Sequence, residues 1–215
     1  MKSISASAFA IAALCVLAPS CLAQKWELGG VAGGGFYNNL TVSNGIGSAL
    51  TGFQSGPAFG AVLGQNLYPR ISGELRYTYH RDDLTVTGAG NKATFKGLSH
   101  AVHYDILFHL HPARARVRPF VAVGAGVKMY SGSGTESAYQ PLSNFALLTK
   151  AQQWKPLLSA GAGTKFAVSP RLSLRVEFRD YITQFPTNVI APAPGAKLHG
   201  LVHDFVPMLG LTYTF

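Results

Sequence analysis

Cysteine is nearly missing from this chain, and its two copies, Cys15 and Cys21, both fall close to the N-terminus. Charged residues are also scarce at 13%, with nine acidic residues against 18 Lys and Arg. After residue 23, no segment is apolar for 18 consecutive positions. The main part of the chain is therefore not expected to contain a disulfide, a cysteine-ligated metal or a membrane-spanning helix.

The first residues have the order of a secretory signal. Lys2 is followed by an apolar run over residues 4–18, and the small residue Ala23 precedes Gln24. This order is typical of a cleavable signal peptide, and the run is shorter than the roughly 20 residues that a spanning helix needs. We predict a signal peptide over residues 1–23 and one mature domain over residues 24–215. Lipoprotein processing at Cys21 is the alternative.

The last residues alternate in character. Leu209, Leu211, Tyr213 and Phe215 are apolar, whereas the residues between them are small or polar. Successive side chains of a strand point to opposite faces, so this alternation predicts a strand with one apolar face. The same period predicts eight strands in all, over residues 26–37, 57–67, 71–83, 94–110, 119–130, 154–168, 172–185 and 198–215.

The predicted strands are joined alternately by short turns and by longer polar segments. The turns cover residues 68–70, 111–117 and 169–171, and the predicted loops cover residues 38–56, 87–92, 131–153 and 186–197. This asymmetry is typical of outer-membrane barrels. The first and last strands can pair, and in hydrocarbon such closure is obligatory because an open edge leaves backbone groups unpaired. The fold class predicted is all-β, an eight-stranded antiparallel up-and-down transmembrane β-barrel.

The ending LGLTYTF resembles the last strand of bacterial outer-membrane β-barrels. From Trp26 to Phe215 the chain resembles small barrels of the outer membrane protein A (N-terminal domain) and outer membrane protein X families. The resemblance implies the outer membrane of a Gram-negative bacterium, with phospholipid and lipopolysaccharide around the wall. It also implies insertion by the barrel assembly machinery, with Leu209, Leu211, Tyr213 and Phe215 as the assembly signal. It implies no particular reaction, because one fold hosts many functions.

Charged side chains occupy the face of the strands that would point into the barrel. The predicted interior set is Glu27, Glu74, Arg76, His80, His103, Asp105, Lys128, Lys165, Arg175, Glu177, Arg179 and Asp204. An eight-stranded barrel is just wide enough for side chains to fill, and buried charge is costly unless paired. The near balance of signs predicts an ion-pair network that plugs the barrel. A narrow ion channel is the alternative, since charges within a membrane often mark function.

Some polar residues are of the types found in catalytic and metal sites. Ser99, His103 and Asp105 share a face, as in a hydrolase acting on lipid A. However, Ser99 and His103 on one strand would lie roughly 13 Å apart, whereas direct proton transfer needs about 3 Å. The histidine pairs lack the third ligand that zinc needs. We therefore predict no enzyme activity, cofactor or metal, with a lipid-modifying enzyme as the alternative.

Aromatic residues gather at both ends of the predicted strands. Those near the short turns are Trp26, Tyr68, Phe166, Tyr213 and Phe215. Those near the loops are Phe36, Tyr37, Phe95, Tyr130, Trp154 and Phe185. Barrels place such girdles at the two lipid–water boundaries, which is the location we predict for both groups. A sugar-stacking site in the loops would use the same residue types.

The excess positive charge gathers at the short turns, and a different partner is expected at each end of the barrel. Arg70, Arg114, Arg116, Arg118 and Arg171 lie at the short turns, where we expect phospholipid headgroups or a periplasmic anionic polymer. An exported chain is not expected to bind nucleic acid. The long loops are expected to meet an extracellular ligand of unknown identity. The predicted role is thus a scaffold whose loops serve in binding or adhesion.

Overall fold

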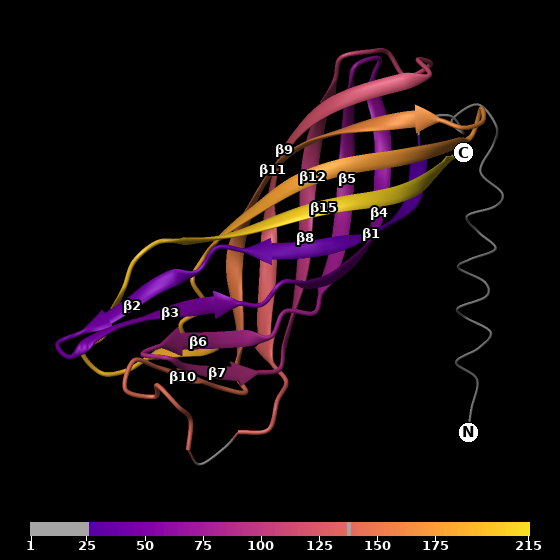
Figure 1. The fold of residues 1–215 in the computed structure, drawn as a ribbon. Helices are drawn as coiled ribbons and strands as arrows, with labels where there is room; N and C mark the ends of the chain where they lie inside the picture. Colours follow the sequence, from indigo (N-terminus) through magenta and orange to yellow (C-terminus); the bar gives the residue numbers. More distant parts are fainter. Residues whose placement is uncertain (1–25, 137–138) are drawn as a thin grey trace, which may run out of the picture.

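The computed structural model describes residues 26–136 and 139–215, so the predicted signal peptide lies outside the described residues. Eight long antiparallel strands form a closed barrel in the ring order β1-β15-β12-β11-β9-β8-β5-β4 (Figure 1). They are β1 (Trp26–Tyr37), β4 (Gly56–Tyr68), β5 (Ile71–His80), β8 (Gly97–His109), β9 (Val117–Gly132), β11 (Gln152–Ala167), β12 (Leu172–Gln184) and β15 (Leu201–Thr214). The predicted fold class is confirmed. No helix in this part of the chain is long and apolar enough to cross a membrane.

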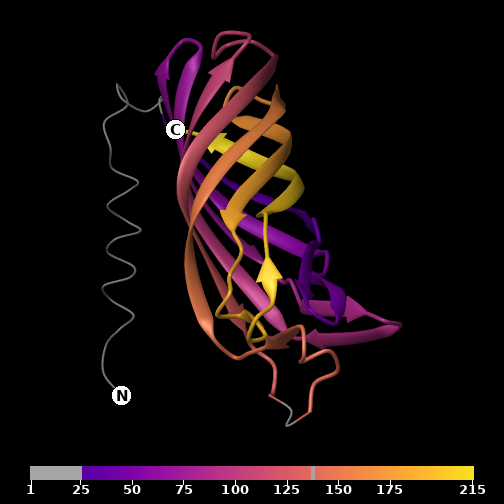
Figure 2. The ribbon, with the colours of Figure 1, turned by 90° about the vertical axis from the view of Figure 1, so that its left-hand side faces the viewer.

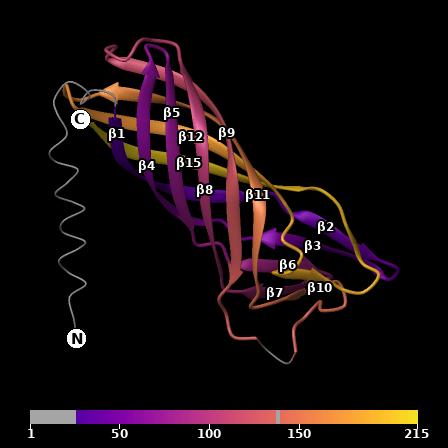
Figure 3. The same cartoon turned by 180° about the vertical axis from the view of Figure 1, so that it is seen from behind.

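The two-residue period of the sequence becomes an inner and an outer wall. On β8, for example, Tyr104 and Ile106 are exposed on the outside, whereas His103 and Asp105 are buried inside. Figure 3 shows β4, β5 and β8 side by side in this wall. An apolar exterior around a polar interior is the arrangement that lipid on the outside requires.

Glycine makes room for charged side chains inside the wall. A Cβ on Gly35 would lie 2.9 Å from Asp204 Oδ1, and one on Gly124 would lie 2.1 Å from Asp105 Oδ1. Any larger residue at these two positions would displace a buried carboxylate. The first barrel strand, β1, pairs with the last one, β15, on one side and with β4 on the other. The ring therefore has no free edge.

The segments that were predicted as polar loops are largely folded, and this prediction was wrong. A five-stranded sheet, in the order β14-β2-β3-β6-β7, continues beyond one end of the barrel (Figure 2). Its strands are β2 (Leu40–Asn44), β3 (Gly47–Phe53), β6 (Leu84–Gly88), β7 (Asn91–Phe95) and β14 (Lys197–Leu198). Two further short strands, β10 (Ala146–Leu148) and β13 (Ile190–Pro192), pair with each other. These strands have two to seven residues and are shorter than every strand of the barrel.

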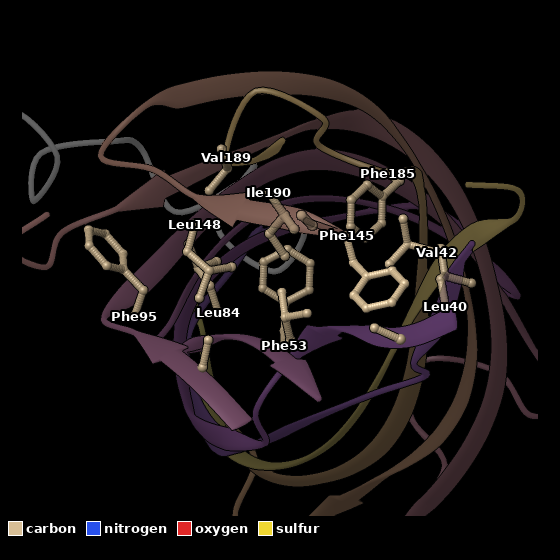
Figure 4. Packing of buried hydrophobic residues seen from close by; sticks show 14 of the residues in the cluster. Leu40, Val42, Phe53, Leu84, Phe95, Phe145, Leu148, Phe185, Val189 and Ile190 are labelled. Atoms are coloured by element: carbon tan, nitrogen blue, oxygen red, sulfur yellow. The ribbon is translucent and has the colours of Figure 1, made fainter. Parts of the chain in front are cut away.

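We call this region the cap; it comprises residues 38–55, 81–96, 133–136, 139–151 and 185–200. The cap has a hydrophobic core of its own (Figure 4). The core includes Leu40, Val42, Phe53, Leu84, Phe95, Phe145, Leu148, Phe185, Val189 and Ile190. Tyr130 and Val202, from the ends of β9 and β15, belong to the same core and join the cap to the barrel.

The predicted aromatic girdle at the loop end is therefore only partly present. Phe36 and Trp154 are exposed on the outer wall as expected. Phe95, Tyr130 and Phe185 instead lie in the cap core, and Tyr37 packs against it. Because the chain continues from the barrel strands into the cap, the rings that point inward or belong to the cap are surrounded by protein and not by lipid.

Candidate functional site

The centre of the barrel is crossed by arginine–carboxylate pairs. Glu74 on β5 accepts hydrogen bonds from Arg175 Nη1 at 2.6 Å and from Arg76 Nη2 at 2.7 Å. Arg76 Nη1 lies 2.6 Å from Glu177 Oε1 on β12. In the ring order, β5 and β12 are diametrically opposite. These ion pairs therefore span the full width of the interior.

The same network extends toward β8. Arg179 Nη1 donates to Asp105 Oδ2 at 2.8 Å, and its Nε donates to Glu177 Oε2 at 3.3 Å. His103 Nδ1 lies 3.0 Å from Asp105 Oδ1. Three arginines thus face three carboxylates, each buried in the barrel. Charges buried in this way are retained only when they are paired and hydrogen-bonded.

A second polar layer lies between the centre and the cap. Lys128 Nζ donates to Asp204 Oδ2 at 2.6 Å and to the Tyr37 hydroxyl at 3.0 Å. Tyr37 in turn donates to Asp82 Oδ2 at 2.5 Å. His80 Nδ1 lies 3.3 Å from Asp204 Oδ2. This layer ties β1, β9 and β15 to the start of the cap.

Asp82 belongs to this layer although the predicted interior set did not contain it. It lies two residues beyond the end of β5 and is buried, and Ser99 Oγ also donates to it at 2.8 Å. Burial raises the pKa of Asp82 to about 7, an effect that Lys128 and the hydrogen bonds from Tyr37 and Ser99 oppose. The pKa of this carboxyl thus lies near neutral pH.

A third layer closes the end with the short turns. Lys165 Nζ donates to Glu27 Oε2, and Asn66 Nδ2 donates to Glu27 Oε1 at 3.1 Å. Arg118 Nη1 donates to Asn66 Oδ1 at 2.9 Å. Polar contacts from four different strands therefore meet at this end of the interior.

The structure brings together every residue of the predicted interior set. All twelve are buried, and each of the ten Asp, Glu, Lys and Arg residues takes part in at least one salt bridge. His80 and His103 each lie within 3.3 Å of a carboxylate oxygen. The predicted assembly residues Leu209, Leu211, Tyr213 and Phe215 are exposed on the outer face. Their recognition by the assembly machinery stays a prediction.

The candidate hydrolase residues do not form a nucleophile–base pair. Ser99 is fully buried and donates to Asp82, whereas the partner of His103 is Asp105. His203, which the sequence pairs with His199, lies with its Nδ1 2.8 Å from Asp180 Oδ2. In the described residues, no three His, Cys, Asp or Glu side chains are grouped so that they could hold a metal ion.

A closed eight-stranded antiparallel wall, apolar outside and ionic inside, defines an outer-membrane β-barrel. The chain belongs to the family described as outer membrane protein beta-barrel domain, whose sequence model matches residues 6–202. The protein is accordingly a component of the outer membrane of a Gram-negative bacterium. Comparison with curated protein sequences gives no match.

Several solved structures share this fold. Neisserial surface protein A is 14% identical with a TM-score of 0.53, and the match covers 88% of this chain and 97% of that one. Outer membrane protease OmpT from Escherichia coli is 10% identical with a TM-score of 0.50, covering 93% and 99%. The N-terminal barrel of Pseudomonas aeruginosa OprF is 14% identical with a TM-score of 0.47, covering 88% and 97%. At these identities the likeness concerns the fold alone.

Proposed function

We propose that this protein is a non-enzymatic outer-membrane scaffold, whose ion-paired interior supports a folded extracellular cap that binds a partner outside the cell. The observation that carries this proposal is the hydrophobic core of the cap. Sixteen buried residues from the cap and from the adjoining ends of the barrel strands hold the sheet in one arrangement. A preorganised surface loses less conformational entropy on binding than flexible loops do.

The cap offers a concave surface suited to a ligand. A cleft of about 520 Å³ lies where the outer face of the five-stranded sheet meets the barrel rim. Its lining includes the side chains of Asn39, Gln54, Ser55, Thr87 and Lys92. None of these five side chains makes a hydrogen bond to the part of the chain that the structure describes, so all are available to a partner. The cleft volume falls within the usual range of about 300–1,000 Å³ for ligand sites.

Blocking the cleft tests this function. Cells that express the protein, and cells that do not, are compared on arrays of immobilised glycans and extracellular proteins. We expect cap-dependent binding that Thr87→Trp removes, because the larger side chain fills the cleft. Ser48→Trp is the matched control on the same face of the sheet, outside the cleft lining, and should bind normally. Identical binding by expressing and non-expressing cells to every probe would refute the proposal.

Lipid A composition tests the enzymatic alternative. Mass spectrometry of lipid A from strains with and without the gene should give identical spectra for a scaffold. A new or missing acyl chain that depends on the protein would show that it is a lipid-modifying enzyme.

A further inference from the structure

A cavity lies at the end of the barrel opposite to the cap, beside the short turns. Its volume is about 460 Å³, and it lies between the turn over residues 110–116 and the turn over residues 168–171. In outer-membrane barrels the short turns face the periplasm, so the cavity is at the periplasmic mouth. Three cationic side chains line it, those of Arg114, Arg118 and Lys165, with Glu27 as its one carboxylate.

The cavity has more hydrogen-bond donors than acceptors. Glu27 already accepts hydrogen bonds from Lys165 and Asn66, so its carboxylate is largely satisfied. Arg114 makes no hydrogen bond or ion pair to any described residue, and its guanidinium has five N–H donors. The side-chain hydroxyls of Ser173 and Thr214 also line the cavity. A donor-rich pocket with unmatched positive charge is suited to an oxyanion.

Arg118 is held in place before any ligand binds. Its Nε, Nη1 and Nη2 donate to His111 O, Asn66 Oδ1 and Pro69 O at 3.4, 2.9 and 3.4 Å. The side chain is nearly fully buried. Three of its five N–H groups are thus used to fix the guanidinium, and the others remain. A preorganised guanidinium is the usual device for recognising phosphate or carboxylate.

The charge of the surrounding turns reinforces the cavity. Five arginines lie at the short turns, namely Arg70, Arg114, Arg116, Arg118 and Arg171. Residues 69–70, 110–116 and 168–171 contain no Asp or Glu. Arg118 and Lys165 are buried on the inner wall, whereas their neighbours Val117 and Phe166 are exposed on the outer wall. The cavity therefore opens from the barrel interior to the periplasm and not toward the surrounding lipid. Of the two partners expected for the arginines at the short turns, phospholipid headgroups do not fit the position of Arg118, which is buried on the inner wall.

We propose that this cavity is a binding site for an oxyanion of the periplasm, a phosphate or carboxylate group carried by a soluble molecule. Arg114 and Arg118 bind the oxyanion, and Lys165 supplies long-range attraction. The site is independent of the extracellular function, because it lies at the other end of the molecule.

Titration with inorganic pyrophosphate tests the site. The mature protein in phosphatidylcholine nanodiscs is titrated by calorimetry at low salt, with a neutral disaccharide as the negative control. We expect saturable pyrophosphate binding that becomes about tenfold weaker in Arg114→Gln, the loss expected for one hydrogen bond to a charged group. Arg116→Gln removes the same charge from the same turn outside the cavity lining and should bind nearly as wild type.

Three results would overturn the proposal. One is the absence of binding at millimolar pyrophosphate. Another is an equal loss of pyrophosphate affinity in Arg114→Gln and Arg116→Gln, which would indicate a general effect of charge. The third is loss of pyrophosphate binding when the nanodiscs contain phosphatidylglycerol, which would identify a lipid headgroup as the occupant. Unchanged migration on an unboiled gel shows that each variant is folded.

Discussion

Glu74 contacts guanidinium groups from both sides of the barrel. Its carboxylate lies within 2.7 Å of Arg76 and Arg175, and 3.5 Å from Arg179. Removing one charge from such a buried network leaves the others without compensation, which costs more than the net stabilisation that the intact network provides.

We expect Glu74→Gln to lower the free energy of unfolding by about 3–5 kcal/mol, since three arginines would then face only Glu177 and Asp105. Urea unfolding in detergent micelles, followed by tryptophan fluorescence, measures the change. Glu136→Gln is the control, because Glu136 is exposed and its one hydrogen bond to the described residues comes from the backbone amide of Lys150. A change of less than about 1 kcal/mol for Glu74→Gln would mean that water enters the network and screens it.

Asp82 gives the protein a pH-dependent stability. Its pKa is raised from 3.8 to about 7, so between these values the folded state binds more protons than the unfolded state. The contribution of Asp82 to the free energy of unfolding is therefore greatest below about pH 4, and it is lost as the pH rises through about 7. We expect wild type to lose stability relative to Asp82→Asn between pH 5 and pH 8, by a few kcal/mol at most, given about 1.4 kcal/mol per pKa unit.

Unfolding midpoints across this pH range measure the effect. Asp83→Asn, at the adjacent and less buried position, should keep the wild-type pH dependence. Parallel curves for wild type and Asp82→Asn would contradict a raised pKa.

The interior residues were predictable because they follow a two-residue period over long strands. The same period also contained a signal for two residues of the second layer that the predicted set lacked, Tyr37 and Asp82. Tyr37 is an even number of residues from Glu27, so it lies on the same face of β1. Asp82, just beyond β5, is likewise an even number of residues from Glu74. Both fall inside predicted strands, over residues 26–37 and 71–83. Tyr37 was nevertheless assigned to the loop-end girdle and Asp82 was left out of the interior set, because the sequence does not show that these strand ends pass into a folded cap.

The short strands of the cap were not predictable in the same way. β10 has three residues and β14 has two, too few to establish a period. Polar residues dominate their outer faces, so the segments have the composition of loops. What folds them is packing between distant segments: Phe145 and Ile190 belong to the same core as Leu40 and Phe53. A single sequence does not show which of these segments meet.

Phe145 provides a test of the cap as a folded unit. It is buried in the core, whereas Leu147 on β10 is exposed between the buried residues Ala146 and Leu148. We expect Phe145→Ala to destabilise the cap by about 3–5 kcal/mol through loss of packing and formation of a cavity. Limited proteolysis of whole cells should then cleave the cap of Phe145→Ala and spare that of Leu147→Ala. Equal resistance of the two variants would show that the core does not hold the cap.

At the scale of the whole molecule, buried side chains continue from the barrel interior into the cap. Three ionic layers occupy the interior from the periplasmic mouth to the cap, and the cap core covers the outer end. The eight-stranded fold followed from the sequence because lipid outside and closure of the ring leave few alternatives. The function proposed for the cap did not follow from the sequence, since one barrel fold supports many roles.

The most direct test of this account is the conductance of the purified mature protein in planar lipid bilayers. We expect no channel openings at neutral pH and moderate salt, because ion pairs between β5 and β12 cross the full interior and the cap core lies above them. Stable, reproducible single-channel currents would contradict the filled interior, and with it the role of the barrel as a closed support for the cap.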